Sequence, residues 1–176
     1  PTATRKESSA ASDLNKRQLE ESLQKAIRSV DPSFAGFSQN DFVDDAEIEE
    51  ELASPTDRRI FALANALSNG MSIERIHELS SIDRWFLSKL AGIIATAKAM
   101  ERSGAAQIPA DLLRQAKQLG FSDHQIARYS ASTELAVRRR RQELGIMPCV
   151  KEIDTVAAEF RAHTHSEART FTALGH

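Results

Sequence analysis

Residue types that can carry out acid–base or metal chemistry are present in the chain, but their spacing does not assemble a site. His163 and His165 alternate near the end of the chain, and Cys149 precedes them. A zinc site needs several such ligands to converge, so we interpret these histidines as surface residues. His77 and His124 each stand beside a carboxylate residue in predicted short helices, where the polar face suits them better than a catalytic role. With no glycine-rich phosphate loop and no nucleophile elbow, we expect no catalytic, cofactor-binding or metal-ligating residue.

Four consecutive arginines, Arg138–Arg141, raise the alternative of a DNA-binding domain. Residues 120–145 have the rhythm of a helix-turn-helix, in which a recognition helix uses arginines on phosphates and guanines. Against this, the net charge is -2 and a dense acidic segment would repel DNA. Glu134 also lies one turn before Arg138, in the favourable orientation for an ion pair within a helix. We keep helix-turn-helix DNA binding as the alternative function and expect no nucleic-acid partner.

The composition is that of an ordinary globular domain. The chain has 176 residues, of which 41% are hydrophobic and 27% charged. The single cysteine excludes an internal disulfide and fits a reducing compartment. No run of eighteen apolar residues exists, so we expect no membrane partner. The chain begins with Pro1 and no signal-peptide pattern follows, so we expect an intracellular piece of a longer polypeptide.

A strongly acidic segment, residues 41–57, is interrupted by apolar residues at roughly helical spacing. One interpretation is a solvated helix face. The other is a docking surface for a basic neighbour, within the chain or across an oligomer. The candidate interface residues are Glu47, Glu50 and Glu51 in this segment, together with Arg138, Arg139, Arg140 and Arg141.

The hydrophobic pattern predicts an all-α fold, because apolar residues recur at intervals of three and four and no segment alternates like a strand. We expect two small helical bundles of about seven to nine helices in residues 16–162. Residues 1–15 are predicted to be a disordered tail, and residues 163–176 a frayed tail. Four expected helices cover residues 16–30, 82–103, 132–144 and 154–162. A fifth is capped by Ser54–Pro55 and closed at Asn69–Gly70, and a sixth is opened by Pro109. Two short helices are capped by Ser72 and Ser122.

An internal sequence repeat predicts two copies of a helix–short helix–helix unit. Gly70, Ser72, Ile76 and Ser80 recur as Gly120, Ser122, Ile126 and Ser130, and Trp85 and Leu87 are answered by Leu135 and Val137. The core of the two bundles is predicted from apolar residues on the helical faces. These core residues are Phe61, Leu67, Ile76, Leu79, Ile82, Trp85, Phe86, Leu90, Ile94, Leu113, Ile126, Val137 and Leu144.

Four segments, in order along residues 17–160, resemble one family. The first segment is Arg17 with residues 20–28, and the second is residues 57–70. The third is residues 70–87, which end in Ile82-Asp83-Arg84-Trp85-Phe86-Leu87. The fourth combines residues 120–127, Arg138–Arg141 and residues 148–160. Together they are similar to the helical oligomerisation domain of the carbamoyl phosphate synthetase large chain. Lys16 stands where that family usually has glycine, and residues 164–171 differ from the family's tyrosine-rich continuation.

The resemblance implies a structural role. In that family the helical domain joins two ATP-grasp halves, one making carboxyphosphate and one phosphorylating carbamate, and contributes to association of large chains. ATP and magnesium bind to the halves, so the resemblance implies no cofactor in this segment. The implied partners are the two flanking halves, a second large chain and a glutaminase subunit or domain. The parent enzyme is a ligase that makes carbamoyl phosphate from bicarbonate, ATP and glutamine-derived ammonia, for arginine or pyrimidine biosynthesis, in mitochondria or cytoplasm.

Overall fold

The computed structural model describes residues 19–31, 33–41, 43–103, 108–151 and 168–171, and it confirms the all-α class. Eight α-helices lie in these residues, accompanied by one 3-10 turn at Asp45–Glu47. The helices are α2 (Leu19–Val30), α3 (Ile48–Ala53), α4 (Arg59–Ser68), α5 (Ile73–Ser80), α6 (Arg84–Ser103), α7 (Ala110–Gln118), α8 (Asp123–Tyr129) and α9 (Glu134–Glu143).

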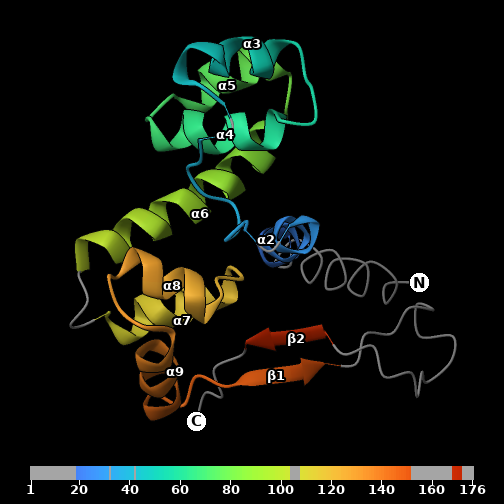
Figure 1. The fold of residues 1–176 in the computed structure, drawn as a ribbon. Coiled ribbons are helices and arrows are strands. Elements are labelled where there is room, and N and C mark those ends of the chain that lie inside the picture. The colour runs from blue at the N-terminus through green and yellow to red at the C-terminus, as the bar shows by residue number, and fades with distance from the viewer. Residues whose placement is uncertain (1–18, 32, 42, 104–107, 152–167, 172–176) are drawn as a thin grey trace, which may run out of the picture.

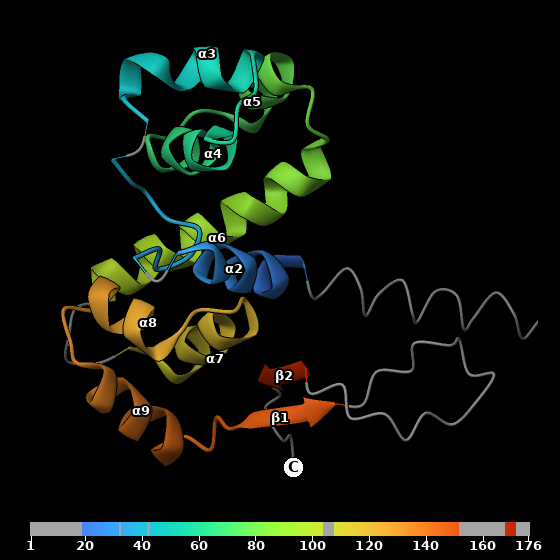
Figure 2. The same ribbon diagram turned by 45° about the vertical axis from the view of Figure 1, so that its right-hand side comes forward.

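Helix α6 is the axis of the molecule. It has 20 residues, which corresponds to a length of about 30 Å. Its first part packs with α4 and α5, which with α3 form what we call the first bundle (Figures 1 and 2). Its second part packs with α7 and α8, which with α9 form the second bundle. Helix α2 lies alongside α6 between the two bundles. No helix among the described residues is long and apolar enough to cross a lipid bilayer.

The predicted duplication is present in the backbone. Gly70 and Gly120 both adopt φ +85°, a left-handed conformation that glycine tolerates and that ends α4 and α7. Two residues later, Ser72 accepts a hydrogen bond from the Arg75 N–H, and Ser122 does the same for Gln125. Both serines were predicted as helix caps, and both predictions are confirmed.

The structural repeat continues to the end of each short helix. Ser80 and Ser130 are both buried, and each donates its hydroxyl to the carbonyl four residues earlier, over 2.6 Å and 2.9 Å respectively. The next residues, Ser81 and Ala131, have φ of 56° and 49°. The chain therefore makes the same reversal twice, fifty residues apart, before entering α6 and α9.

Two helix starts differ from the sequence-based prediction. Ser54 does not cap α4, because its N–H donates to Glu50 O over 2.8 Å and ends α3 instead; α4 begins at Arg59. Helix α9 is capped by Thr133, whose hydroxyl accepts the Ala136 N–H over 3.2 Å. A neighbouring hydroxyl thus satisfies the free end of α9, whereas Arg58, which precedes α4, makes no side-chain cap hydrogen bond.

The C-terminal region contains a short antiparallel strand pair. Strand β1 (Pro148–Lys151) pairs with β2 (Ala168–Phe171), with Pro148 opposite Phe171. Of the segment that we expected to be a frayed tail, residues 163–176, only residues 168–171 are described, and they form β2. The tail predicted at residues 1–15 and the helix predicted at residues 154–162 lie outside the described residues.

Most of the predicted core residues lie inside, but two do not. The buried ones are Leu67, Ile76, Leu90, Ile94, Leu113, Ile126 and Val137, and Phe61, Leu79, Ile82 and Leu144 are partly buried against them. The prediction for Trp85 and Phe86 is wrong, since these side chains are 37% and 47% exposed. Asp83 accepts the Trp85 N–H over 2.8 Å, which places both aromatic residues in the first turn of α6. The inward face begins instead at Leu87, which is fully buried.

Candidate interaction surfaces

The two exposed aromatic residues form one patch. Trp85 and Phe86 contact each other edge to face, with ring centroids 4.9 Å apart and an interplanar angle of 85°. The Lys89 ammonium lies 5.5 Å from the centre of the Trp85 ring and 3.3 Å from the Glu20 carboxylate. The aromatic pair, as we call Trp85 and Phe86, therefore lies near the start of α2 and is held by a cation–π contact.

The second copy of the duplicated unit repeats this outward placement in weaker form. Leu135, fifty residues after Trp85, is 72% exposed in the first turn of α9. Large exposed apolar side chains that cluster are characteristic of contact surfaces, whereas single ones are common on any protein. The aromatic pair is therefore the stronger candidate, and Leu135 is its natural comparison.

The three candidate glutamates of the acidic segment have different surroundings. Glu51 is buried, and it accepts hydrogen bonds from the Thr56 hydroxyl over 2.7 Å and from the Arg58 guanidinium over 2.8 Å. These contacts, the Thr56 hydrogen bond first, lower the pKa of Glu51. Glu47 lies 3.5 Å from Arg58, and Glu50 is exposed. Glu51 is thus removed as an interface residue, because it ties the end of α3 to the turn before α4.

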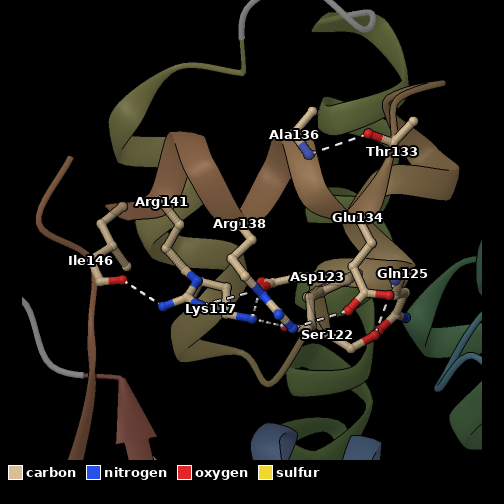
Figure 3. Close-up of polar contacts among 11 residues, drawn as sticks. Lys117, Ser122, Asp123, Gln125, Thr133, Glu134, Ala136, Arg138, Arg141 and Ile146 are labelled. Carbon is tan, nitrogen blue, oxygen red and sulfur yellow. Dashed lines mark hydrogen bonds and ion pairs between the residues drawn. The ribbon is translucent and has the colours of Figure 1, made fainter. Parts of the chain in front are cut away.

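The arginine run is likewise divided between surface and interior. Arg141 is buried, and Figure 3 shows its guanidinium donating to Ile146 O over 2.9 Å and to Asp123 Oδ2 over 3.3 Å. Arg138 is 3.3 Å from Glu134, so the predicted ion pair is confirmed. The prediction of Arg141 as an interface residue is wrong, because its side chain points into the second bundle.

Asp123 is the centre of a buried charge cluster that the sequence did not reveal. Lys117 donates to Asp123 Oδ1 over 2.8 Å and to Phe121 O over 2.8 Å, and its side chain is 3% exposed. Burial lowers the pKa of Lys117, opposed by the hydrogen bond and charge of Asp123. We call Lys117, Asp123 and Arg141 the charge triad; it joins α7, α8 and the end of α9 (Figure 3).

The charge triad has no counterpart in the first bundle. Fifty residues earlier the same places hold Leu67, Ile73 and Ala91, which are buried or partly buried among apolar neighbours. Helical spacing alone does not show that a charged side chain of one copy is buried where the other copy buries an apolar one. The fifty-residue offset, with Lys117 falling on an apolar position, is the one signal that could have indicated it.

These contacts also bear on the helix-turn-helix alternative. Arg138, Arg140 and Arg141 each contact a carboxylate of the same molecule, Arg140 lying 3.7 Å from Glu143. Arg139 is exposed. A recognition helix presents its cations to phosphates, whereas α9 pairs most of its cations internally. The geometry gives no support to DNA binding.

The histidines do not form a metal centre within the part of the chain that the structure describes, where no three potential ligands converge. His77 Nδ1 lies 2.7 Å from Ile82 O, which positions its ring against the loop before α6. His124 is exposed. His163 and His165 lie outside the described residues.

Comparison with known proteins identifies the family. The model of the oligomerisation domain of the carbamoyl-phosphate synthetase large chain matches residues 16–145. The chain is 51% identical over 160 residues to the multifunctional protein ura1 of Schizosaccharomyces pombe, covering 91% of this chain and 7% of that protein.

Two further relatives give the same result. The arginine-specific, mitochondrial carbamoyl phosphate synthase large chain of the same yeast is 47% identical over 162 residues, covering 91% of this chain and 14% of the relative. The multifunctional protein CAD of Squalus acanthias is 48% identical over 161 residues, covering 91% and 7%. The chain thus spans only a small part of each of these relatives. It belongs to the family of the oligomerisation domain of the carbamoyl-phosphate synthetase large chain.

Proposed function

We propose that this chain is a non-catalytic linker and oligomerisation domain of a carbamoyl phosphate synthetase large chain. The observation that carries this proposal is the family match over residues 16–145, which includes all eight described helices. The domain would join the half that makes carboxyphosphate to the half that makes carbamoyl phosphate, with ATP and magnesium bound by those halves. The parent enzyme would take its ammonia from a glutaminase subunit or domain and act inside the cell, as the mitochondrial relative does.

The arrangement of α6 supports the linker role. A flexible tether would consist of residues without mutual contacts, whereas here one continuous helix is buried in both bundles through residues such as Leu90, Ile93 and Met100. The position of one bundle relative to the other is therefore set by α6. A rigid spacer of this kind would hold two flanking domains at a defined separation.

For self-association, we propose that the aromatic pair is the central contact. Aromatic side chains are enriched at the centres of protein interfaces. Asp83 bonds the Trp85 N–H, Lys89 lies over the Trp85 ring, and Phe86 packs edge to face against that ring. Glu50 and Arg139 are exposed charged residues, of the kind that suits the polar rim of an interface. This assignment replaces Glu51 and Arg141, which are buried.

The test is sedimentation of the 176-residue chain over a wide range of protein concentration. We expect the mass of the wild-type chain to rise with concentration, and the double variant Trp85→Ser, Phe86→Ser to remain monomeric. The matched control is Leu135→Ser, which removes an exposed apolar side chain from the equivalent place and should behave as the wild type. A wild-type chain that stays monomeric throughout, or a double variant that associates as well as the wild type, would contradict the role of the aromatic pair.

A further inference from the structure

A pocket of about 210 Å³ lies where three separate parts of the chain meet. Ser38 and Gln39 come from the loop between α2 and α3, and Glu101 comes from the end of α6. The remaining wall is α8, with Gln125 buried, Tyr129 partly buried and Arg128 exposed. None of these residues belongs to the aromatic pair or to the charge triad, so the pocket is a separate feature of the domain.

The floor of the pocket contains a buried amide whose orientation is fixed by its neighbours. Gln24 Oε1 accepts the backbone N–H of Phe37 over 3.1 Å, so this atom must be the oxygen of the Gln24 amide. Gln125 therefore presents its amino group to it, and Nε2 donates to Gln24 Oε1 over 3.2 Å. Gln24 Nε2 in turn donates to Leu119 O over 3.3 Å. The Gln125 oxygen is consequently left as a buried acceptor.

That acceptor has no protein donor. Gln125 is fully buried, and its Oε1 has no hydrogen-bond partner among the described residues. Both amides pack closely against Gly36, because a Cβ built on Gly36 would lie 2.9 Å from Gln125 Nε2 and 2.2 Å from Gln24 Oε1. A buried carbonyl oxygen without a donor is costly. Because no part of Gln125 is open to solvent, the residue forms a closed wall of the pocket.

Groups of opposite charge stand around the same space. Burial raises the pKa of Tyr129; a hydrogen bond with Ser38 opposes this rise, Glu101 adds to it, and Arg128 and the Gln125 amide oppose it. Glu101 and Arg128 therefore both act on the Tyr129 phenol from the walls of the pocket. Both charged side chains are on exposed residues, so a small molecule can reach them from solvent.

We propose that this pocket binds a free α-amino acid. The ammonium group would donate to the Glu101 carboxylate, and the carboxylate would accept from Arg128 and from the Tyr129 hydroxyl. This pairing uses one anion and one cation of the pocket, and charge-assisted hydrogen bonds of this kind are the strong ones. The volume is smaller than that of most drug-sized sites and suits a molecule with few atoms.

The test is a ¹H–¹⁵N NMR titration of the 176-residue chain with glycine, L-alanine, L-serine and L-glutamine. We expect saturable shifts at the backbone amides of Gln39, Gln125 and Arg128. The matched probes are N-acetyl-L-alanine, which lacks the ammonium, and L-alaninamide, which lacks the carboxylate. Each should bind at least about tenfold more weakly than L-alanine, because each loses a charge-assisted contact.

Two variants place the binding in the pocket. Glu101→Gln and Arg128→Gln change exposed side chains and should leave the fold unchanged, and each should weaken L-alanine binding by about tenfold or more. Arg102→Gln, a neighbouring exposed residue outside the pocket, is the control and should bind as the wild type. No saturable shift with any of the four amino acids would overturn the proposal and leave solvent as the occupant. Equal binding of the two capped probes, or by the Glu101 and Arg128 variants, would also overturn it.

Discussion

At the scale of single residues, Gly70 and Gly120 share one backbone conformation but have different neighbours. Both have φ +85°, yet a Cβ at Gly120 would lie 2.7 Å from Glu21 Cα, whereas nothing lies within 4 Å of a Cβ at Gly70. The left-handed conformation is thus needed at both positions, and the absence of a side chain is needed only where α2 crosses the end of α7.

We therefore expect Gly120→Ala to cost more stability than Gly70→Ala. The Gly70 variant should lose about 1–2 kcal/mol of unfolding free energy, from the left-handed conformation alone. The Gly120 variant should lose a further 1–3 kcal/mol or so, because the added methyl group meets the backbone of α2. Urea unfolding of both variants measures the difference. Equal losses would show that α2 can move away from Gly120 at no cost.

Residue-level prediction from sequence succeeded where a single residue type suits a single local geometry. Ser72 and Ser122 were correctly predicted as caps, because a serine before an apolar helix satisfies its free N–H groups. Trp85 was misplaced because hydrophobicity alone says nothing about which side of the first helical turn faces inward. The buried states of Lys117 and Gln125 could not be predicted, since each depends on partners far along the chain or in another helix.

At the scale of elements, the attachment of α9 depends mainly on its last turn. The sequence analysis grouped Arg138–Arg141 as candidate interface residues, but only Arg138, Arg139 and Arg140 are exposed. Val137 and Arg141 form the buried side, with Arg141 reaching both Asp123 of α8 and the carbonyl of Ile146. The helix is therefore held by one apolar side chain and one buried cation.

We expect Arg141→Ala to lower the unfolding free energy by about 2–4 kcal/mol, because it leaves Ile146 O unpaired and weakens the neutralisation of a buried carboxylate. The matched control is Arg139→Ala, an exposed position two residues away, which should change stability by no more than about 0.5 kcal/mol. Denaturant unfolding followed by circular dichroism gives both values. Similar losses in the two variants would mean that Arg141 contributes only surface charge.

At the scale of the whole molecule, the two bundles form one structural unit because α6 belongs to both. The fold class, the number of bundles and the duplication were all evident in the sequence, since helical periodicity and repeated turn residues are local signals. The antiparallel pairing of β1 with β2 was not, because it joins segments that are separated along the chain.

A shared helix predicts a single unfolding transition. Leu63 in α4 and Leu113 in α7 hold equivalent buried positions in the two copies. Leu63→Ala and Leu113→Ala should each cost about 2–5 kcal/mol, and each should shift the whole transition. Trp85 fluorescence, which reports on the start of α6, and far-ultraviolet circular dichroism should give coincident curves for both variants. Separate curves for Leu113→Ala would show that the second bundle unfolds by itself.

The first bundle holds Leu67, Ile73 and Ala91 where the second bundle holds the charge triad, and this difference affects how the two copies respond to temperature. Apolar burial loses strength on cooling, which affects the first bundle most. The cost of removing charges from water falls on heating, which favours the triad in the second bundle. The two copies of the unit therefore respond differently to temperature. Cooling should destabilise the first bundle more than the second, and heating should favour the ionic contacts of the second bundle.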